Sequence, residues 1–116
     1  MKKRISEVAK IFREKAYESE FGGKDRGRFQ ITRTNVKKML GVSRLHDRTV
    51  EKLIDACLAE GLVLMDMDDN FAIGEAQYIS KWRKIPARLI EEYTHELELS
   101  LGVSTSGRND DELDDE

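Results

Sequence analysis

The sequence is poor in cysteine and proline, and it contains no long hydrophobic run. Its 116 residues include one cysteine and one proline. The single cysteine, Cys57, cannot form a disulfide within the chain, which excludes a disulfide-stapled secreted scaffold. No segment approaches the roughly 20 apolar residues that a membrane-spanning helix needs. The N-terminus opens with basic residues, but charged residues interrupt the apolar stretch that a signal peptide would need after them. We therefore expect a soluble, cytoplasmic protein.

Acidic residues slightly outnumber basic ones, but the two signs are separated along the chain. The 23 acidic and 20 basic residues give a net charge of −3. Residues 108–116 hold six acids and one arginine, whereas residues 24–52 hold nine basic residues against three acids, a block of +6. Such a block favours a surface that binds a polyanion, and an acidic tail can solvate the protein or compete for that surface.

The N-terminal part of the chain reads as a helix followed by a short strand. Apolar side chains three and four positions apart predict an amphipathic helix that starts near Ile5 and closes at Gly22 and Gly23. Alternating polar and apolar side chains then predict a strand over residues 28–31.

Two helices joined by a turn follow this strand. The first is about two turns long, is capped by Thr32 or Thr34, and ends at Gly41. Its inward side chains are Val36, Met39 and Leu40. The second ends at Gly61, with Ser43 or Asp47 as its cap, and has the strongest helical periodicity in the chain. Its predicted inward side chains are Val50, Leu53, Ile54, Cys57 and Leu58.

A β-hairpin and a long helix complete the predicted elements. Residues 62–67 and 71–73 are strand-like and flank an acidic turn at 68–70. Residues 76–101 are helical in pattern, although Pro86 predicts a kink or break near Ile85. We expect a domain over 1–75, a packing or dimerisation segment over 76–102, and a disordered acidic tail over 103–116.

Three short motifs fall in the central helices and the hairpin: V-K-K-M-L-G-V-S at residues 36–43, R-T-V at 48–50 followed by Leu53-Ile54, and L-A-E-G-L-V at 58–63. With the order of elements, they resemble the winged helix-turn-helix family. In that family a short helix ends in L-G-V-S, a Thr-Val pair opens the buried face of the second helix, and a stretch ending in G-L-V leads into the wing. The resemblance implies an α+β, mostly helical fold with a small β-hairpin wing and a Pro-interrupted C-terminal helix.

Two features differ from the family pattern. Five residues, 44–48, separate Ser43 from Thr49, where the family usually has about two. Either the second helix begins earlier or a longer turn precedes it. The hairpin is acidic, with no Lys or Arg between Leu53 and Ser80, so we do not expect it to insert into a minor groove.

The resemblance implies that the partner is double-stranded DNA, bound by a transcriptional regulator or a plasmid- or phage-type factor. The predicted base-reading side chains lie around the start of the second helix: Arg44, His46, Arg48, Thr49 and Lys52. The predicted phosphate contacts are Arg26, Arg28, Arg33, Thr34, Lys37 and Lys38. The alternative is a winged-helix adaptor that docks onto another protein.

The C-terminal helix carries an apolar stripe that predicts a homodimer: Ile79, Trp82, Leu89, Tyr93 and Leu97. Residues 81–88 are basic without an acid, and residues 91–98 are acidic without a base. Antiparallel pairing of two such helices would set each basic half against an acidic half. We therefore predict that this segment pairs with its copy.

Other candidate sites receive simpler interpretations. Asp66, Asp68 and Asp69 lack the glycine and terminal glutamate of a calcium loop, so a polar hairpin turn explains them. Cys57 lies on an apolar helix face and is expected to be a buried thiol. His46 and His95 match no catalytic or zinc spacing. We expect no metal, no cofactor and no enzymatic activity. Single-stranded nucleic acid binding is not expected either, because the sequence shows no basic groove studded with aromatic residues.

Overall fold

A computed structural model describes residues 1–102, so the predicted disorder of residues 103–116 lies outside the described residues. The chain divides into two units, one that runs from Met1 to Trp82 and one that begins at Arg83. The first unit therefore extends beyond the predicted boundary at residue 75. No helix within residues 1–102 is long and apolar enough to cross a membrane.

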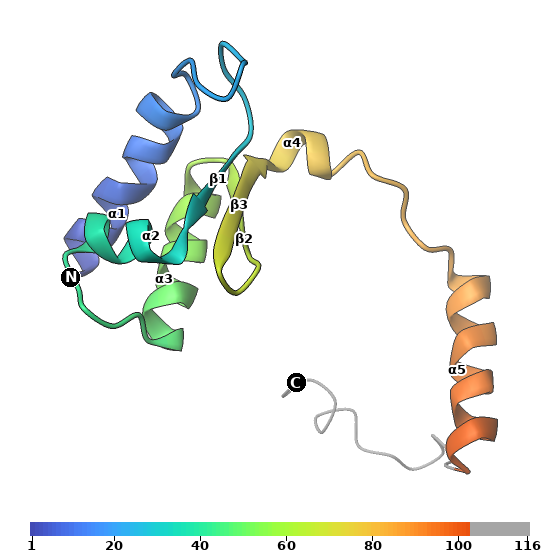
Figure 1. The fold of residues 1–116 in the computed structure, drawn as a ribbon. Coiled ribbons are helices and arrows are strands. Elements are labelled where there is room, and N and C mark those ends of the chain that lie inside the picture. The colour runs from blue at the N-terminus through green and yellow to red at the C-terminus, as the bar shows by residue number, and fades with distance from the viewer. Residues whose placement is uncertain (103–116) are drawn as a thin grey trace. The chain divides into compact units, whose positions relative to one another are not determined.

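The described residues form an α+β fold that is mostly helical, with a small antiparallel sheet (Figure 1). In chain order the elements of the first unit are α1 (Lys2–Ile11), a π-helical continuation η1 (Phe12–Ala16), β1 (Phe29–Thr32), α2 (Arg33–Leu40), α3 (Asp47–Ala59), β2 (Leu62–Asp66), β3 (Asn70–Glu75) and α4 (Ala76–Ile79). The second unit contains α5 (Ala87–Leu101).

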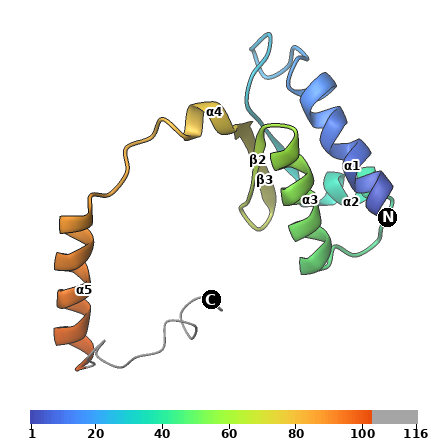
Figure 2. The same cartoon turned by 180° about the vertical axis from the view of Figure 1, so that it is seen from behind.

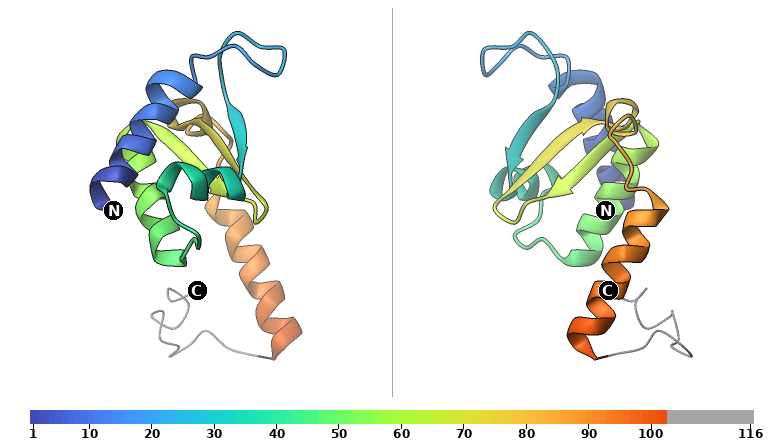
Figure 3. Two further views of the ribbon diagram at one scale, coloured as in Figure 1. Left: turned by 60° about the vertical axis from the view of Figure 1, so that its left-hand side comes forward. Right: turned by 90° about the vertical axis from the view of Figure 1, so that its right-hand side faces the viewer.

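The sheet has the order β1-β3-β2, and both pairings are antiparallel. Ile73 on the central strand β3 is paired with Phe29 on β1 and with Leu64 on β2. Helices α1, α2 and α3 cover one face of this sheet, as seen from behind in Figure 2. The right-hand view in Figure 3 shows the other face, on which no helix of the first unit is stacked.

The core lies between the three helices and the covered face of the sheet. Each strand alternates, so every second side chain points into this core, and Phe71 and Ile73 of β3 are almost fully buried. Val36 and Leu40 of α2 and Leu53 of α3 pack in the same cluster. Burial of a large apolar side chain is worth roughly 1.5–3 kcal/mol, so this cluster fixes α2 and α3 on the sheet.

Several predicted boundaries were wrong. The N-terminal helix ends well before Gly22, because the π-helical turn η1 closes it at Tyr17, whose N–H donates to the carbonyl of Phe12 at 2.9 Å.

Leu58 was predicted to face the core but is 55% exposed. It lies two turns after Glu51, on the same outer flank of α3, whereas Val50 and Cys57 hold the buried face.

Of the two alternatives predicted at Pro86, a break rather than a kink is correct. Helix α4 ends at Ile79, residues 83–86 have no regular secondary structure, and α5 begins after Pro86. Pro86 lacks an N–H and has extended backbone angles, so it ends the irregular segment and precedes the helix. The predicted stripe therefore does not run along one continuous helix.

Candidate nucleic-acid interface

The turn between α2 and α3 begins at a glycine with a left-handed backbone. Gly41 has φ +71°, and the N–H groups of Gly41 and Val42 donate to the carbonyls of Lys38 and Lys37. The guanidinium of Arg4 lies 3.0 Å from the position that a Cβ at Gly41 would occupy, and its Nε donates to the carbonyl of Met39 at 2.9 Å. A cation at the C-terminus of α2 also complements the helix dipole.

The rest of this turn is longer than the family pattern, and α3 begins at Asp47 rather than earlier. Of the two alternatives, a longer turn before the helix is therefore correct. Val42 and Leu45 anchor the turn, because both pack against the core. The predicted caps were wrong: the N-cap is His46, whose side chain makes no capping hydrogen bond, and Asp47 is the first helical residue. Thr32 does cap α2, accepting from the N–H of Asn35 at 3.1 Å.

The predicted base-reading side chains lie on the turn and on the first half of α3. Arg44 and His46 on the turn are exposed, as are Arg48 and Lys52 on α3, while Thr49 is half-buried. Arg48 and Lys52 are one turn apart and face away from the core. Glu51 and Asp55 form a parallel acidic stripe beside them, so the basic side chains occupy one flank of the outer face of α3.

Helix α2 presents a smaller part of the predicted phosphate set. Thr34 and Lys38 are exposed and one turn apart, and Lys37 is half-buried at the edge of the same helix. We call these exposed and half-buried side chains the α2–α3 basic surface: Thr34, Lys37, Lys38, Arg44, His46, Arg48, Thr49 and Lys52.

Arg33, at the start of α2, already forms hydrogen bonds within the first unit. Its Nη1 donates to Asp66 Oδ1 at 2.9 Å and to the carbonyl of Asp68 at 2.8 Å, and its guanidinium lies 5.0 Å from the ring centre of Phe71. The backbone N–H of Asp68 and the Arg33 guanidinium both donate to the Asp66 carboxylate, and these hydrogen bonds lower the pKa of Asp66. Arg33 therefore ties α2 to the β2–β3 turn.

Arg26 and Arg28 do not join the α2–α3 basic surface. They precede β1, whereas α2 begins where β1 ends, so the strand separates them from that surface (Figure 1). Arg26 donates two hydrogen bonds of 2.8 Å to the carboxylate of Glu18, which lower the pKa of Glu18 and raise that of Arg26. Arg28 borders a groove on the uncovered face of the sheet.

One buried carboxylate, at the end of β3, was not predicted from the sequence. Glu75 is 6% exposed and accepts hydrogen bonds from Arg13 Nη1 at 2.9 Å, Tyr17 Oη at 2.8 Å and Gln77 Nε2 at 3.0 Å. The hydrogen bond from Arg13, followed by that from Tyr17, lowers the pKa of Glu75. Burial and the same carboxylate raise the pKa of Tyr17. The cluster joins the end of the N-terminal helix to the sheet, and no sequence pattern linked these distant residues.

The predicted dimerisation residues divide between the two units. Ile79 and Trp82 belong to the first unit, where Ile79 lies 3.8 Å from the position of a Cβ on Gly74. Leu89, Tyr93 and Leu97 lie on α5. Lys81, Arg83 and Lys84 lie outside any helix, and only Arg88 is on α5, so the predicted basic half-helix does not form. Pairing with a second copy stays a prediction.

Two candidate groups for metal or thiol chemistry can be described within residues 1–102. Within this range no three His, Cys, Asp or Glu side chains come together in a way that could hold a metal ion. Cys57 is fully buried, and burial, with a smaller effect of Glu60, raises the pKa of its thiol to about 12. A thiol with this pKa is not a nucleophile at neutral pH.

Comparison with known proteins gives no family. No protein-family model, no curated protein and no solved structure matches the chain significantly.

Proposed function

We propose that the first unit is a winged helix-turn-helix domain that binds double-stranded DNA, as a transcriptional regulator or a plasmid- or phage-type DNA-binding factor. Helix α2 is the supporting helix, α3 is the recognition helix, and β2–β3 is the wing. A B-DNA major groove is about 12 Å wide and admits an α-helix. The exposed half of α3 that follows the turn is the part that would enter it.

One observation carries this proposal: the cations of the α2–α3 basic surface have no partner within residues 1–102. The side chains of Lys38, Arg44, Arg48 and Lys52 are exposed, and none of these side chains forms a hydrogen bond or ion pair with a residue from 1 to 102. In contrast, Arg13, Arg26 and Arg33 are paired with carboxylates. A set of unpaired cations around one helix start suits a polyanion.

We assign two roles to the α2–α3 basic surface. Arg44, Arg48 and Lys52 lie where α3 begins and would face base edges, with His46 and Thr49 beside them. Thr34, Lys37 and Lys38 on α2 would contact phosphates and set the orientation of the domain on the duplex.

The β2–β3 hairpin contributes little to DNA affinity in this proposal. Arg33 pairs with Asp66, but Asp68 and Asp69 remain exposed at the turn. Two carboxylates at the tip would be repelled by a phosphate backbone. The hairpin therefore stays out of the minor groove, and specificity comes from α3.

We also propose that α5 pairs with α5 of a second copy, so that two domains bind a site with two-fold symmetry. Side chains on one face of the helix are apolar, and three of them are 46–59% exposed within the described residues: Ile90, Tyr93 and Leu97. An isolated helix of about 15 residues is only marginally stable in water. Burial of this face against a copy would stabilise it.

Two substitutions test the division of roles. Arg48→Ala should weaken binding to the preferred site by about 1–3 kcal/mol and relax its sequence preference, whereas Lys38→Ala should weaken all duplexes alike and flatten the salt dependence. The preferred site is first selected from a random duplex pool, and fluorescence anisotropy then gives both affinities. Asp55→Asn, on the acidic stripe of α3, is the matched control that should lose no affinity. Equal losses for both alanine variants on selected and random DNA would refute the assignment.

The adaptor alternative has one observation in its favour. Leu58 is 55% exposed on α3 beside the acidic stripe of Glu51 and Asp55, an arrangement that suits a basic protein partner with an apolar contact. A duplex that fails to bind at low salt, together with a partner whose binding is lost in Leu58→Ser, would favour this function instead.

A further inference from the structure

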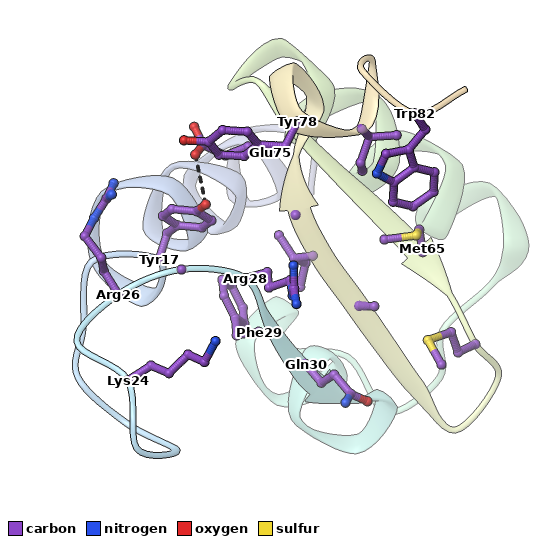
Figure 4. A pocket seen from close by; sticks show the side chains of 16 residues that line it. Tyr17, Lys24, Arg26, Arg28, Phe29, Gln30, Met65, Glu75, Tyr78 and Trp82 are labelled. Carbon is purple, nitrogen blue, oxygen red and sulfur yellow. Dashed lines mark hydrogen bonds between the residues drawn. The ribbon is translucent and has the colours of Figure 1, made fainter. Parts of the chain in front are cut away.

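The uncovered face of the sheet carries a groove of about 640 Å³. It is separate from the α2–α3 basic surface, because it is lined by the loop before β1, by the three strands and by the residues around α4. Figure 4 shows Lys24 and Arg26 on one side, Trp82 and Met65 on the other, and Arg28 between them. Its volume falls in the range of ligand-binding pockets.

The floor and one wall of this groove are apolar. Ala72 and Gly74 of β3 are too small to fill the face of the central strand, so the floor stays open between larger neighbours. Met65 lies next to Trp82, and the indole of Trp82 is 65% exposed. A large aromatic side chain at the lip of an open groove offers a stacking surface for a planar ring.

The other side of the groove and its centre are cationic, at Lys24 and Arg28. Both side chains are exposed, and neither side chain forms a hydrogen bond or ion pair with any residue from 1 to 102. The only acidic residue that lines the groove is Glu75, whose carboxylate already accepts hydrogen bonds from Arg13, Tyr17 and Gln77. The ligand must therefore combine negative charge with a planar apolar group.

We propose that this groove binds single-stranded nucleic acid, with a base stacked on Trp82 and the adjoining phosphates beside Lys24 and Arg28. The sequence around Trp82 favours a strand over a single small anion. Lys81 precedes Trp82, and its Nζ lies 5.9 Å from the ring centre of Tyr78, which also lines the groove. Cations spread around a stacking residue suit a backbone that continues past the bound base. A duplex offers no such contact, since its base faces are hidden in the stack.

Trp82 is the only tryptophan in the chain, so its fluorescence reports on this groove alone. The full chain is titrated with oligothymidylate of about 12 nucleotides, within the site sizes of known single-strand binders. We expect saturable quenching of Trp82 that weakens with added salt. Oligouridylate of the same length shows whether the sugar matters, and binding of either strand supports the proposal.

Variants separate this groove from the α2–α3 basic surface. With a labelled oligothymidylate read by anisotropy, Trp82→Ala and the pair Lys24→Ala/Arg28→Ala should each weaken binding about tenfold, and Trp82→Phe should restore most of the loss. Lys52→Ala is the control that should leave single-strand affinity unchanged. Conversely, Trp82→Ala should leave duplex affinity unchanged, so failure here is distinguishable from failure of the proposed duplex binding.

Three results would overturn the proposal. Thymidine monophosphate that quenches Trp82 with the affinity of the oligomer would identify a small-molecule pocket. Equal quenching by a duplex would remove the single-strand preference. A change in Trp82 fluorescence with protein concentration alone, without any response to oligonucleotide, would show that a second copy occupies the groove.

Discussion

Single arginines illustrate how far residue roles follow from sequence. Arg33 and Arg26 lie in the basic block and were predicted to contact phosphate, but each has an internal carboxylate partner. The partner of Arg33 is 33 residues away in the sequence, and only the fold brings the two together. Arg48 and Lys52 could be placed on an outer face from helical spacing alone, because that inference needs no distant partner.

The Glu75 cluster makes stability depend on pH. The folded state lowers the pKa of Glu75, so its carboxylate stabilises the fold at pH values above the ordinary carboxyl pKa near 4.5. This stabilisation is lost as the pH falls through the lower pKa that Glu75 has in the folded state. Glu75→Gln should cost about 1.5–3 kcal/mol at neutral pH, the worth of hydrogen bonds to a charged group. Thermal unfolding from pH 7 to pH 3 measures both effects.

The variant should also show a flatter loss of stability in acid, although Asp66 and Glu18, whose pKa values are lowered as well, still contribute. Glu51→Gln, on the exposed flank of α3, serves as control and should follow the parent. If the stability of Glu75→Gln fell with pH in parallel with that of the parent chain, the role of the cluster would be contradicted.

Gly41 is a second residue with a measurable cost. Its φ of +71° disfavours a side chain by about 1–2 kcal/mol, and a Cβ would also meet Arg4 at 3.0 Å. Gly41→Ala should therefore lower the free energy of unfolding by at least that amount, as measured by urea denaturation. In the Arg4→Ala background the substitution should cost less, since the contact is relieved while the backbone strain remains. An equal cost in both backgrounds would show that Arg4 does not matter.

At the scale of elements, the sequence predicted the order of helices and strands and most of the buried positions. Residue spacing and turn residues were enough to locate the end of α2 at Gly41 and the β2–β3 hairpin. It did not reveal η1, because a π-helical turn shifts the register after Phe12 without changing the apolar spacing before it. Pro86 predicted the kink or break in residues 76–101, but helical patterning cannot show how far the break extends.

Helix α5 provides the test of pairing. Tyr93 and Leu97 lie one turn apart and are 46% and 59% exposed, and a paired helix would bury both. Light scattering behind a size-exclusion column, at tens of micromolar protein, should give a dimer for the parent chain and a monomer for Tyr93→Glu/Leu97→Glu. Leu99→Glu, on the other side of α5, is the matched control and should remain dimeric. A parent chain that is only monomeric would remove α5 pairing.

For the whole molecule, the distribution of charge matters more than its sum. A net charge of −3 suggests a protein that binds DNA weakly. The α2–α3 basic surface nevertheless carries unpaired cations, whereas Arg13, Arg26 and Arg33 are paired with carboxylates. The overall charge could be counted from the sequence. Which cations are unpaired could not, because that depends on contacts between residues far apart in the chain.

The most direct test of duplex binding is the salt dependence of affinity for random double-stranded DNA, measured by fluorescence anisotropy with the full chain. Four phosphates neutralised by the α2–α3 basic surface predict measurable binding at about 50 mM salt and a loss of about 100-fold at about 200 mM. Absence of binding at about 50 mM salt, or an affinity that does not change with salt, would contradict the account.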